Sequence, residues 1–244
     1  MRLSPGILWP IPIVLDVADV GNYAIGQRIV LCDEYGKPIA ILSISSIYRA
    51  DKEQEAQKVY GTKNADHFGV RYLFNRVGKY YIGGKLEGLT NVERFDFSEH
   101  RLSPFELREV FLRKGWEKII GFQTRNPLHR AHFSMMREAA QQYKAKVLIH
   151  PSVGLTKDGD IDYITRVRCY LILHKIYMKK FSYLSLLPLA MRMAGPREAL
   201  WHAIIRKNYG CTHIIIGRDH AGPGKDRNDN TFYGPYEAQN LAKQ

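Results

Sequence analysis

The sequence predicts an α/β protein whose larger part is a doubly wound, mostly parallel sheet. After about residue 97, strand-like and helix-like patterns alternate, which is typical of βαβ units. Before that point the patterns are short and strand-like. Polar segments follow two of the later apolar strands, at the strand ends where open α/β sheets bind ligands. We therefore expect a small β-rich domain over residues 1–96 and a Rossmann-like domain over residues 97–244.

The first 91 residues contain the signals of a hairpin and a further strand. Strand patterns at 27–32 and 39–44 flank the turn Glu34-Tyr35-Gly36-Lys37. Residues 51–60 have a helical pattern that Gly61 ends. The strand pattern at 80–86 contains Gly83 and Gly84, which predict a bend or a bulge.

The alternating part begins with a helix signal. Ser103-Pro104-Phe105-Glu106 forms a capping box with proline at the first helical position, and it predicts a helix that continues to Arg113. The segments that follow are predicted as strands at 118–123, 146–150, 183–189 and 212–217, and as helices at 128–143, 161–178 and 196–209.

The helix at 196–209 has clear end signals, with Gly195-Pro196 before it and Gly210 after it. Its apolar residues Trp201, Ile204 and Ile205 recur at spacings of three and four. We expect them to form its core-facing side.

The first polar segment follows the strand predicted at 118–123 and reads Gln123-Thr124-Arg125-Asn126-Pro127-Leu128-His129-Arg130-Ala131-His132. Pro127 suits the first position of a helix, so we expect the helix to begin there and to direct its N–H groups at the loop. An anion binds at such an end. On this helix His129 and His132 would share one face and both could donate to a phosphate. An isolated pair of this kind often only caps a helix, and a zinc site is disfavoured because no glutamate or cysteine pair accompanies it.

The second polar segment, Gly217-Arg218-Asp219-His220-Ala221-Gly222-Pro223-Gly224, follows the strand predicted at 212–217. In a doubly wound sheet the two segments face one crevice, so Arg218 and His220 can meet Arg125 and the histidine pair around one polyanion. The alternative is a surface turn that contains an Arg218–Asp219 ion pair. Lys157 lies in a third loop and could reach a phosphate, but such a lysine is more often solvated, and we leave it out of the site.

Composition limits the class of protein. The chain has 244 residues, 45% of them hydrophobic, and a formal net charge of +12. That charge suits an anionic partner, but the positive residues are scattered, so a nucleic acid is not the expected one. Three widely spaced cysteines favour a reducing compartment, and we expect the cytoplasm. Prolines interrupt the apolar residues near the N-terminus, so we expect no signal peptide. No apolar run in the sequence is long enough to span a membrane.

The two polar segments together resemble the signatures of the ATP sulfurylase (sulfate adenylyltransferase) family, Q-x-R-N-P-x-H-x-x-H and G-R-D-H-A-G-P-G, and both are complete here. Further likeness covers almost the whole chain, at Trp9-Pro10-Ile11-Pro12-Ile13, 52–61, Gly83-Gly84, 187–193 and 195–203. The family usually has proline at the position of Phe68. The resemblance implies a PUA-like N-terminal domain before the catalytic domain. It also implies that this chain is a fragment, which lacks the start of the N-terminal domain and the end of the catalytic domain.

The resemblance implies a reaction and a set of residue roles. Sulfate would attack the α-phosphorus of ATP to give adenosine 5′-phosphosulfate and pyrophosphate, the first step of sulfate assimilation, and Mg²⁺ would enter with ATP. The resemblance implies a homo-oligomer. It implies neither residues that bind a metal directly nor an association with a membrane. The implied roles are catalysis by Thr124, Arg125, Asn126, His129 and His132, ATP binding by Gln123, Thr124, Arg125, Asn126, Gly217, Arg218, Asp219 and His220, and sulfate binding by Gln123, Arg125 and Ala221.

Two alternatives stay open from the sequence. The chain could be a nucleotidyltransferase with another acceptor, for instance an organic phosphate. It could also be a catalytically silent module that binds nucleotide or RNA, in which case binding would need neither sulfate nor ATP and would weaken steeply with salt.

Overall fold

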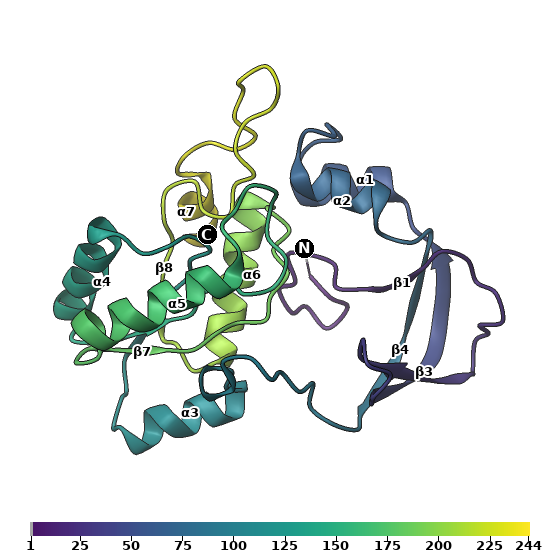
Figure 1. Ribbon diagram of the computed structural model, residues 1–244. Helices are drawn as coiled ribbons and strands as arrows, with labels where there is room; N and C mark the ends of the chain where they lie inside the picture. The colour runs from purple at the N-terminus through teal and green to yellow at the C-terminus, as the bar shows by residue number, and fades with distance from the viewer. Residues whose placement is uncertain (1) are drawn as a thin grey trace. The chain divides into compact units, whose positions relative to one another are not determined.

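The computed structural model describes residues 2–244 and contains two compact units (Figure 1). One unit consists of Ile11–Phe95. The other consists of residues 2–10 together with Asp96–Gln244, so residues 2–10, which the sequence analysis places with the β-rich part, pack with the later unit. Within that unit the ring of Trp9 contacts the ring of Trp201 edge to face, at 4.7 Å between centroids.

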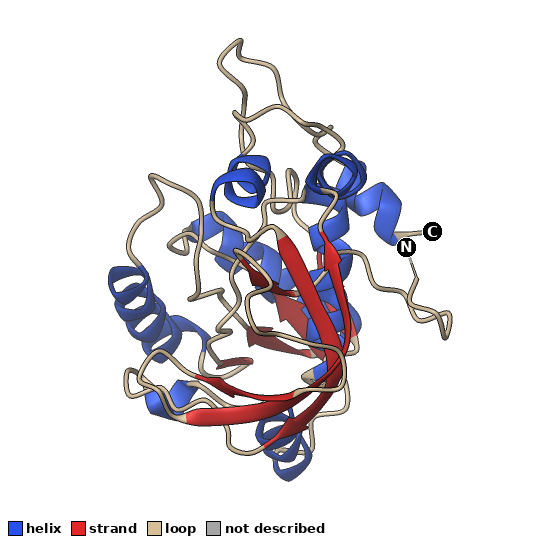
Figure 2. Cartoon of the chain, turned by 90° about the vertical axis from the view of Figure 1, so that its right-hand side faces the viewer, coloured by secondary structure: helices blue, strands red, loops and turns tan. Residues whose placement is uncertain are grey.

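The unit Ile11–Phe95 is built on a four-stranded antiparallel sheet whose curvature is visible in Figure 2. Its strands, in the spatial order β1-β4-β3-β2, are β1 (Leu15–Val17), β4 (Tyr80–Gly88), β3 (Pro38–Arg49) and β2 (Arg28–Cys32). The predicted hairpin is confirmed as β2 and β3. The pairing register of β3 with β4 shifts between Ile44 and Ser46, opposite Gly84 and Gly83. A Cβ at Gly84 would lie 2.0 Å from the Ser43 carbonyl oxygen, so the predicted bulge requires glycine there.

Two helices complete this unit. The predicted helix is confirmed as α1 (Lys52–Tyr60), which ends at Gly61 with a left-handed φ of 72°. The second, α2 (Phe68–Asn75), was not predicted. Its N-cap is His67, whose Nδ1 accepts a hydrogen bond from the Gly69 N–H at 3.0 Å. Phe68 therefore occupies the first helical position, where proline is favoured, and the helix forms there without it.

The other unit is built on a four-stranded parallel sheet. Its strands are β5 (Ile119–Phe122), β6 (Lys146–Ile149), β7 (Ser182–Leu184) and β8 (His213–Ile215), in the spatial order β7-β6-β5-β8. The connecting helices are α4 (Arg130–Tyr143), α5 (Tyr163–Leu173) with one π-helical turn η2 (His174–Met178), and α6 (Gly195–Asn208). Helix α3 (Pro104–Arg113) precedes the sheet, η1 (Ser98–His100) precedes α3, and α7 (Glu237–Ala242) follows the sheet. The capping box of α3 is present as predicted.

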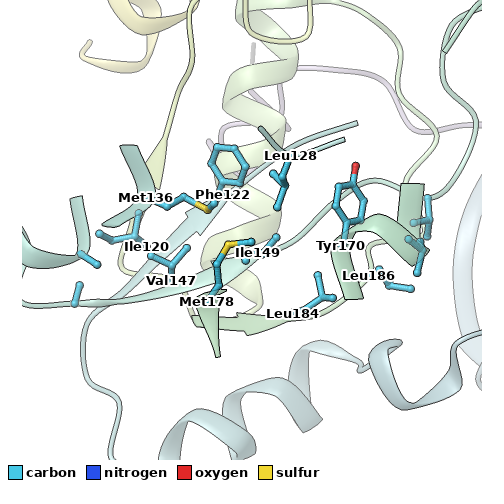
Figure 3. Close-up of a cluster of buried hydrophobic side chains, with 14 residues drawn as sticks. Ile120, Phe122, Leu128, Met136, Val147, Ile149, Tyr170, Met178, Leu184 and Leu186 are labelled. Carbon is cyan, nitrogen blue, oxygen red and sulfur yellow. The ribbon is translucent and has the colours of Figure 1, made fainter. Parts of the chain in front are cut away.

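Both faces of this sheet are covered, as a doubly wound fold requires. On one face, Ile120, Phe122 and Val147 pack with Met136 of α4 and Tyr170 of α5 (Figure 3). On the other, Ile119 and Leu148 pack with Leu107 and Phe111 of α3 and with Tyr209 after α6. A Cβ at Gly121 would lie 2.9 Å from Arg206 Cγ, so glycine lets α6 approach β5 closely.

The strand order creates a switch point between β5 and β8. The chain moves outward from β5 through β6 to β7, and then returns across α6 to place β8 on the free side of β5. In such sheets the ligand crevice lies beyond the carboxyl ends of the two strands that flank the switch point. The predicted α/β fold class is confirmed, and both predicted polar segments follow these two strands.

Three details differ from the sequence predictions. Helix α4 begins at Arg130 and not at Pro127, because residues 124–126 form a polar turn before it. Strand β7 ends at Leu184, and beyond it the chain makes only an isolated bridge from Leu187 to Ser152. Pro188, which cannot donate to a ladder, follows that bridge. In α6 the fully buried residues include Glu198, His202 and Arg206, whereas the predicted core residues Trp201, Ile204 and Ile205 are only half-buried.

Candidate functional site

The loops after β5 and β8 border one cavity of about 170 Å³. Ten of the eleven residues that the sequence analysis selects line it: Gln123, Thr124, Arg125, Asn126, His132, Gly217, Arg218, Asp219, His220 and Ala221. The exception is His129, which borders an apolar groove with Phe133 and Tyr177. The switch point therefore brings together two segments that lie about ninety residues apart in the chain.

The loop after β5 is a polar turn whose side chains are hydrogen-bonded to the protein. The Thr124 hydroxyl donates to the Asn126 carbonyl oxygen at 2.9 Å and accepts from the Asn126 N–H at 3.1 Å. Gln123 Nε2 donates to Ser152 Oγ at 2.9 Å, and Gln123 Oε1 accepts from Arg206. Arg125 Nη1 donates to Asp160 Oδ1. These contacts limit the rotamers that each side chain can adopt.

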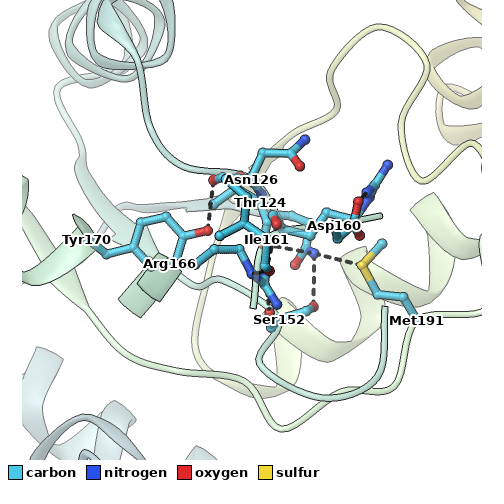
Figure 4. Close-up of polar contacts among 10 residues, drawn as sticks. Thr124, Asn126, Ser152, Asp160, Ile161, Arg166, Tyr170 and Met191 are labelled. Carbon is cyan, nitrogen blue, oxygen red and sulfur yellow. Dashed lines mark hydrogen bonds and ion pairs between the residues drawn. The ribbon is translucent and has the colours of Figure 1, made fainter. Parts of the chain in front are cut away.

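Two side chains of α5 donate hydrogen bonds to the backbone of the same loop (Figure 4). Arg166 is 2% exposed, and its Nη1 donates to the carbonyl oxygens of Arg125 at 2.8 Å and Ser152 at 3.1 Å. Its Nε donates to the Ile161 carbonyl oxygen at 2.8 Å. The Tyr170 hydroxyl donates to the Asn126 carbonyl oxygen at 2.7 Å. Sequence reasoning missed both residues, because an arginine and a tyrosine in a helical pattern resemble ordinary surface residues.

The two histidines meet at the start of α4, although not on one helical face. His129 is the N-cap residue with extended backbone, and His132 lies in the first turn. Their rings are 3.8 Å apart between centroids, and the His129 N–H lies 3.4 Å from His132 Nδ1. Burial, and then the neighbouring His129, lower the pKa of His132. The His132 ring is therefore neutral at pH 7, and it can donate from Nε2 if Nδ1 faces the His129 amide.

The loop after β8 is held through its backbone. Asp219 and Ala221 have left-handed φ angles of 51° and 54°. The Asp219 N–H donates to the Pro235 carbonyl oxygen at 2.9 Å, and the Ala221 carbonyl oxygen accepts from Gly195 at 3.1 Å. The Ala221 N–H has no hydrogen-bond partner among residues 2–244. By contrast, the Arg218 side chain is 68% exposed and lies 3.6 Å from Asp219 Oδ2 and 5.8 Å from the ring of Tyr236.

A buried polar chain supports His220 from α6. His220 Nε2 lies 2.9 Å from His202 Nδ1, and His202 Nε2 lies 3.4 Å from Glu198 Oε1. Glu198 accepts hydrogen bonds from the N–H groups of Arg192 at 3.0 Å and Ala194 at 2.9 Å. Burial lowers the pKa of His220 to about 3, and the nearby His202 and Arg206 act in the same direction. Burial likewise lowers the pKa of His202 and raises that of Glu198. His220 is thus a neutral side chain at pH 7.

Arg206 places a buried positive charge behind the first loop. Its Nη2 donates to Gln123 and to the His150 carbonyl oxygen, the latter at 2.8 Å. Its Nε and Nη1 have no hydrogen-bond partner among the described residues. Burial lowers the pKa of Arg206 to about 10, so the group stays charged at neutral pH. No pattern in the sequence distinguishes this arginine from the solvated residues expected at a helix C-terminus.

A second cavity, of about 330 Å³, also borders Arg125. Lys157 and Lys225 line it, together with Gly222 and Gly224 of the second loop. Lys157, which the sequence analysis leaves out, therefore lies beside the candidate site. Within residues 2–244 no group of three or more His, Cys, Asp or Glu side chains could hold a metal ion. None of the described helices is long and apolar enough to span a bilayer.

The chain is similar to known proteins of one family. The ATP-sulfurylase family profile matches residues 98–244, and a PUA-like domain profile matches residues 1–91. Sulfate adenylyltransferase from Schizosaccharomyces pombe is 54% identical over 100% of this chain and 51% of its own length. The enzyme of the same name from Saccharomyces cerevisiae is 50% identical over 99% of this chain and 48% of its own length.

A solved structure supports the same relationship. The structure described as a hexameric APS kinase from Thiobacillus denitrificans matches with a TM-score of 0.72 and 30% identity, over 88% of this chain and 39% of that one. The chain spans about half the length of the curated relatives it matches. With both loop signatures at one switch-point cavity, and with the family profile covering more than half of its residues, the chain belongs to the ATP-sulfurylase family.

Proposed function

We propose that this chain carries the substrate-binding core of a sulfate adenylyltransferase, which converts ATP and sulfate to adenosine 5′-phosphosulfate and pyrophosphate. The observation that carries the proposal is the shared cavity of the two loops, which combines Arg125, Arg218 and polar donors at the switch point. The names of the relatives, identical at about half of the aligned positions, support the same reaction. In this proposal residues 97–244 perform the chemistry, and the β-rich unit Ile11–Phe95 forms a separate domain.

The reaction needs positioning and charge stabilisation, since sulfate is already a dianion and requires no general base. A sulfate oxygen attacks the α-phosphorus in line, and the bond from that phosphorus to pyrophosphate breaks. Gln123, Arg125 and the Ala221 N–H are proposed to hold sulfate. The Ala221 amide suits that role, because it borders the cavity and has no hydrogen-bond partner among residues 2–244. Donors that are held in place before the reaction cost no reorganisation when charge develops.

The remaining predicted residues are proposed to bind the nucleotide and to stabilise the leaving group. Gly217, Arg218, Asp219 and His220, with the 123–126 loop, would line the ATP site, and Thr124, Arg125 and Asn126 would carry the catalytic contacts. His129 and His132 would stabilise the transition state and pyrophosphate. A neutral His132 can do so through one N–H, as its lowered pKa implies.

Magnesium is proposed to enter as Mg-ATP, as part of the substrate. Asp219 supplies the one carboxylate among the residues that line the cavity, and the nearby carboxylate of Asp160 is bonded to Arg125. Such a site suits an ion that the phosphates and water coordinate.

The small size of the first cavity favours sulfate over a bulkier acceptor. Gln123 and Arg125 lie side by side in a space of about 170 Å³, which suits a small tetrahedral anion. We also propose a cytoplasmic homo-oligomer for which nucleic acid is not a partner. The word hexameric in the description of the solved neighbour supports self-association.

The test is pyrophosphate release from Mg-ATP by this chain, with and without sulfate. Release that requires sulfate, and that an organic phosphate does not replace, is expected. Arg113→Ala, which removes an exposed charge of α3, serves as the control for a general change of charge. Binding of ATP or RNA without sulfate-dependent release would instead favour a silent binding module.

A further inference from the structure

The Arg125–Asp160 pair is an unexpected feature of a site for anions. Arg125 Nη1 donates to Asp160 Oδ1, and the two side chains are 17% and 7% exposed. A carboxylate beside the arginine that binds sulfate reduces the attraction for a dianion. The pair therefore does not serve to strengthen the electrostatic attraction for the anion.

The surroundings of the pair distinguish its two members. Arg125 borders both the cavity of about 170 Å³ and the cavity of about 330 Å³, whereas Asp160 borders neither. The carboxylate thus contacts the guanidinium from the protein side. It occupies one part of the guanidinium and leaves the other N–H groups for a ligand in the cavities. Asp160 contacts Nη1 alone, since Asp160 Oδ2 has no hydrogen-bond partner among the described residues, and this contact limits the directions that the planar guanidinium can take.

Arg166 fixes the backbone at both members of the pair. Its guanidinium donates to the carbonyl oxygen of Arg125 at 2.8 Å and to that of Ile161, the residue after Asp160, also at 2.8 Å (Figure 4). Because Arg166 is itself buried, its hydrogen bonds link the loop after β5 to the 154–161 loop away from solvent. The backbone beside both members of the pair is therefore bonded to one buried side chain.

We infer that Asp160 is a positioning residue, which orients the Arg125 guanidinium toward the sulfate in the cavity. This inference rests on the proposed function. It opposes a simpler reading, in which Asp160 only competes with sulfate for Arg125. When the charge of Asp160 is removed, the positioning role predicts a higher KM for sulfate, and the competing role predicts a lower one.

The experiment compares Asp160→Asn with Asp158→Asn in the full 244-residue chain. Both changes remove one negative charge from the same loop, but Asp158 is exposed and borders neither cavity. If Asp160 positions Arg125, Asp160→Asn raises the KM for sulfate by about tenfold or more, since a displacement of about 1 Å can cost about 100-fold in rate. The KM for ATP should change much less. Asp158→Asn should stay within about twofold of the unchanged chain, as exposed charges contribute little.

Asp160→Glu provides a second variant in case Asp160→Asn perturbs folding. It keeps the charge and displaces the carboxylate by one methylene group, so the positioning reading expects a raised KM for sulfate here as well. A KM that falls in Asp160→Asn, or that stays unchanged in both variants, overturns the inference.

An NMR measurement separates this inference from the proposed function. The Nε–H signal of Arg125, identified by its absence in Arg125→Lys, should be sharp in the unchanged chain and broadened in Asp160→Asn. This readout needs no turnover. A chain without sulfate-dependent release that still shows the broadening would disprove the function and retain the positioning role. An Arg125 signal that Asp160→Asn leaves sharp would disprove the positioning role.

Discussion

The two loops that border the candidate site are held in different ways. In the loop after β5, the side chains of Gln123, Thr124 and Arg125 each make a hydrogen bond to another protein group. In the loop after β8, the backbone is fixed by left-handed residues and by carbonyl contacts, while the Arg218 side chain is 68% exposed. The first loop preorganises side chains, and the second preorganises its backbone, including the Ala221 N–H.

This difference determines where a mutation should be costly. A preorganised donor loses little conformational entropy when the substrate binds, whereas a mobile donor loses more. Side chains of the first loop should therefore matter most for rate. In the second loop, the backbone conformation should matter more than any single exposed side chain.

The largest effect is expected for Arg125→Ala. Loss of one preorganised charged donor should lower the rate of sulfate-dependent pyrophosphate release by about 10²–10³. Steady-state kinetics with Arg113→Ala as the matched control would measure it. Normal turnover in Arg125→Ala would contradict both the assignment of the site and the comparison of the loops.

The next effect concerns the backbone of the second loop. Ala221 has a φ of 54°, and a β-branched side chain is strongly disfavoured there. Ala221→Val should lower kcat/KM by about tenfold or more, because the strain costs on the order of 1–2 kcal/mol and moves the Ala221 N–H. Ala221→Gly, which accepts this φ, should keep activity within about threefold. Equal losses in both variants would mean that the side chain, and not the backbone, matters.

A smaller effect is expected for Arg218→Ala. The Arg218 side chain is exposed and only loosely paired with Asp219. We therefore expect kcat/KM for ATP to fall by about tenfold or less, mainly through a higher KM, and we expect the size of this effect to depend on the salt concentration. Kinetics at low and at high ionic strength would test this. A loss as large as that of Arg125→Ala would show that Arg218 becomes ordered in the complex and would remove the contrast between the loops.

The smallest effect concerns pH and the support of His220. Burial lowers the pKa of His220 to about 3, so the unfolded chain binds this proton at a higher pH than the folded one. The free energy of unfolding is therefore unaffected above about pH 6.5 and falls below it, by up to about 1.4 kcal/mol per pH unit.

Urea unfolding at pH 7.5 and pH 5.5 would measure this dependence. Tryptophan fluorescence is a selective probe, since the three tryptophans, Trp9, Trp116 and Trp201, all belong to the α/β unit. His220→Asn should reduce, by about one, the number of protons that the chain takes up on unfolding at the lower pH. If the free energy of unfolding depends on pH equally in His220→Asn and in the unchanged chain, His220 does not titrate as its burial implies.

Sequence reasoning was most successful for local patterns. The alternation of strands and helices, the glycine pair of β4 and the capping box of α3 were all predicted, because each depends on residues close together in the chain. The start of α4 was wrong by three residues, since the preference of Pro127 for a first helical position lost to the turn that Thr124 and Asn126 form. The core side of α6 was predicted only in part, because Ile205 packs against the core while the fully buried row also contains Glu198, His202 and Arg206.

The sequence by itself determined the parallel sheet, the position of both loops at strand ends and the residue types that those loops offer an anion. Only the tertiary structure decided which groups support them. Asp160 contacts a residue 35 positions away, and Arg206 contacts one 83 positions away. Such partners are selected by burial, where an unpaired charge is costly, and burial depends on how helices pack on the sheet. A charged residue in a helical pattern carries no local sign of that environment.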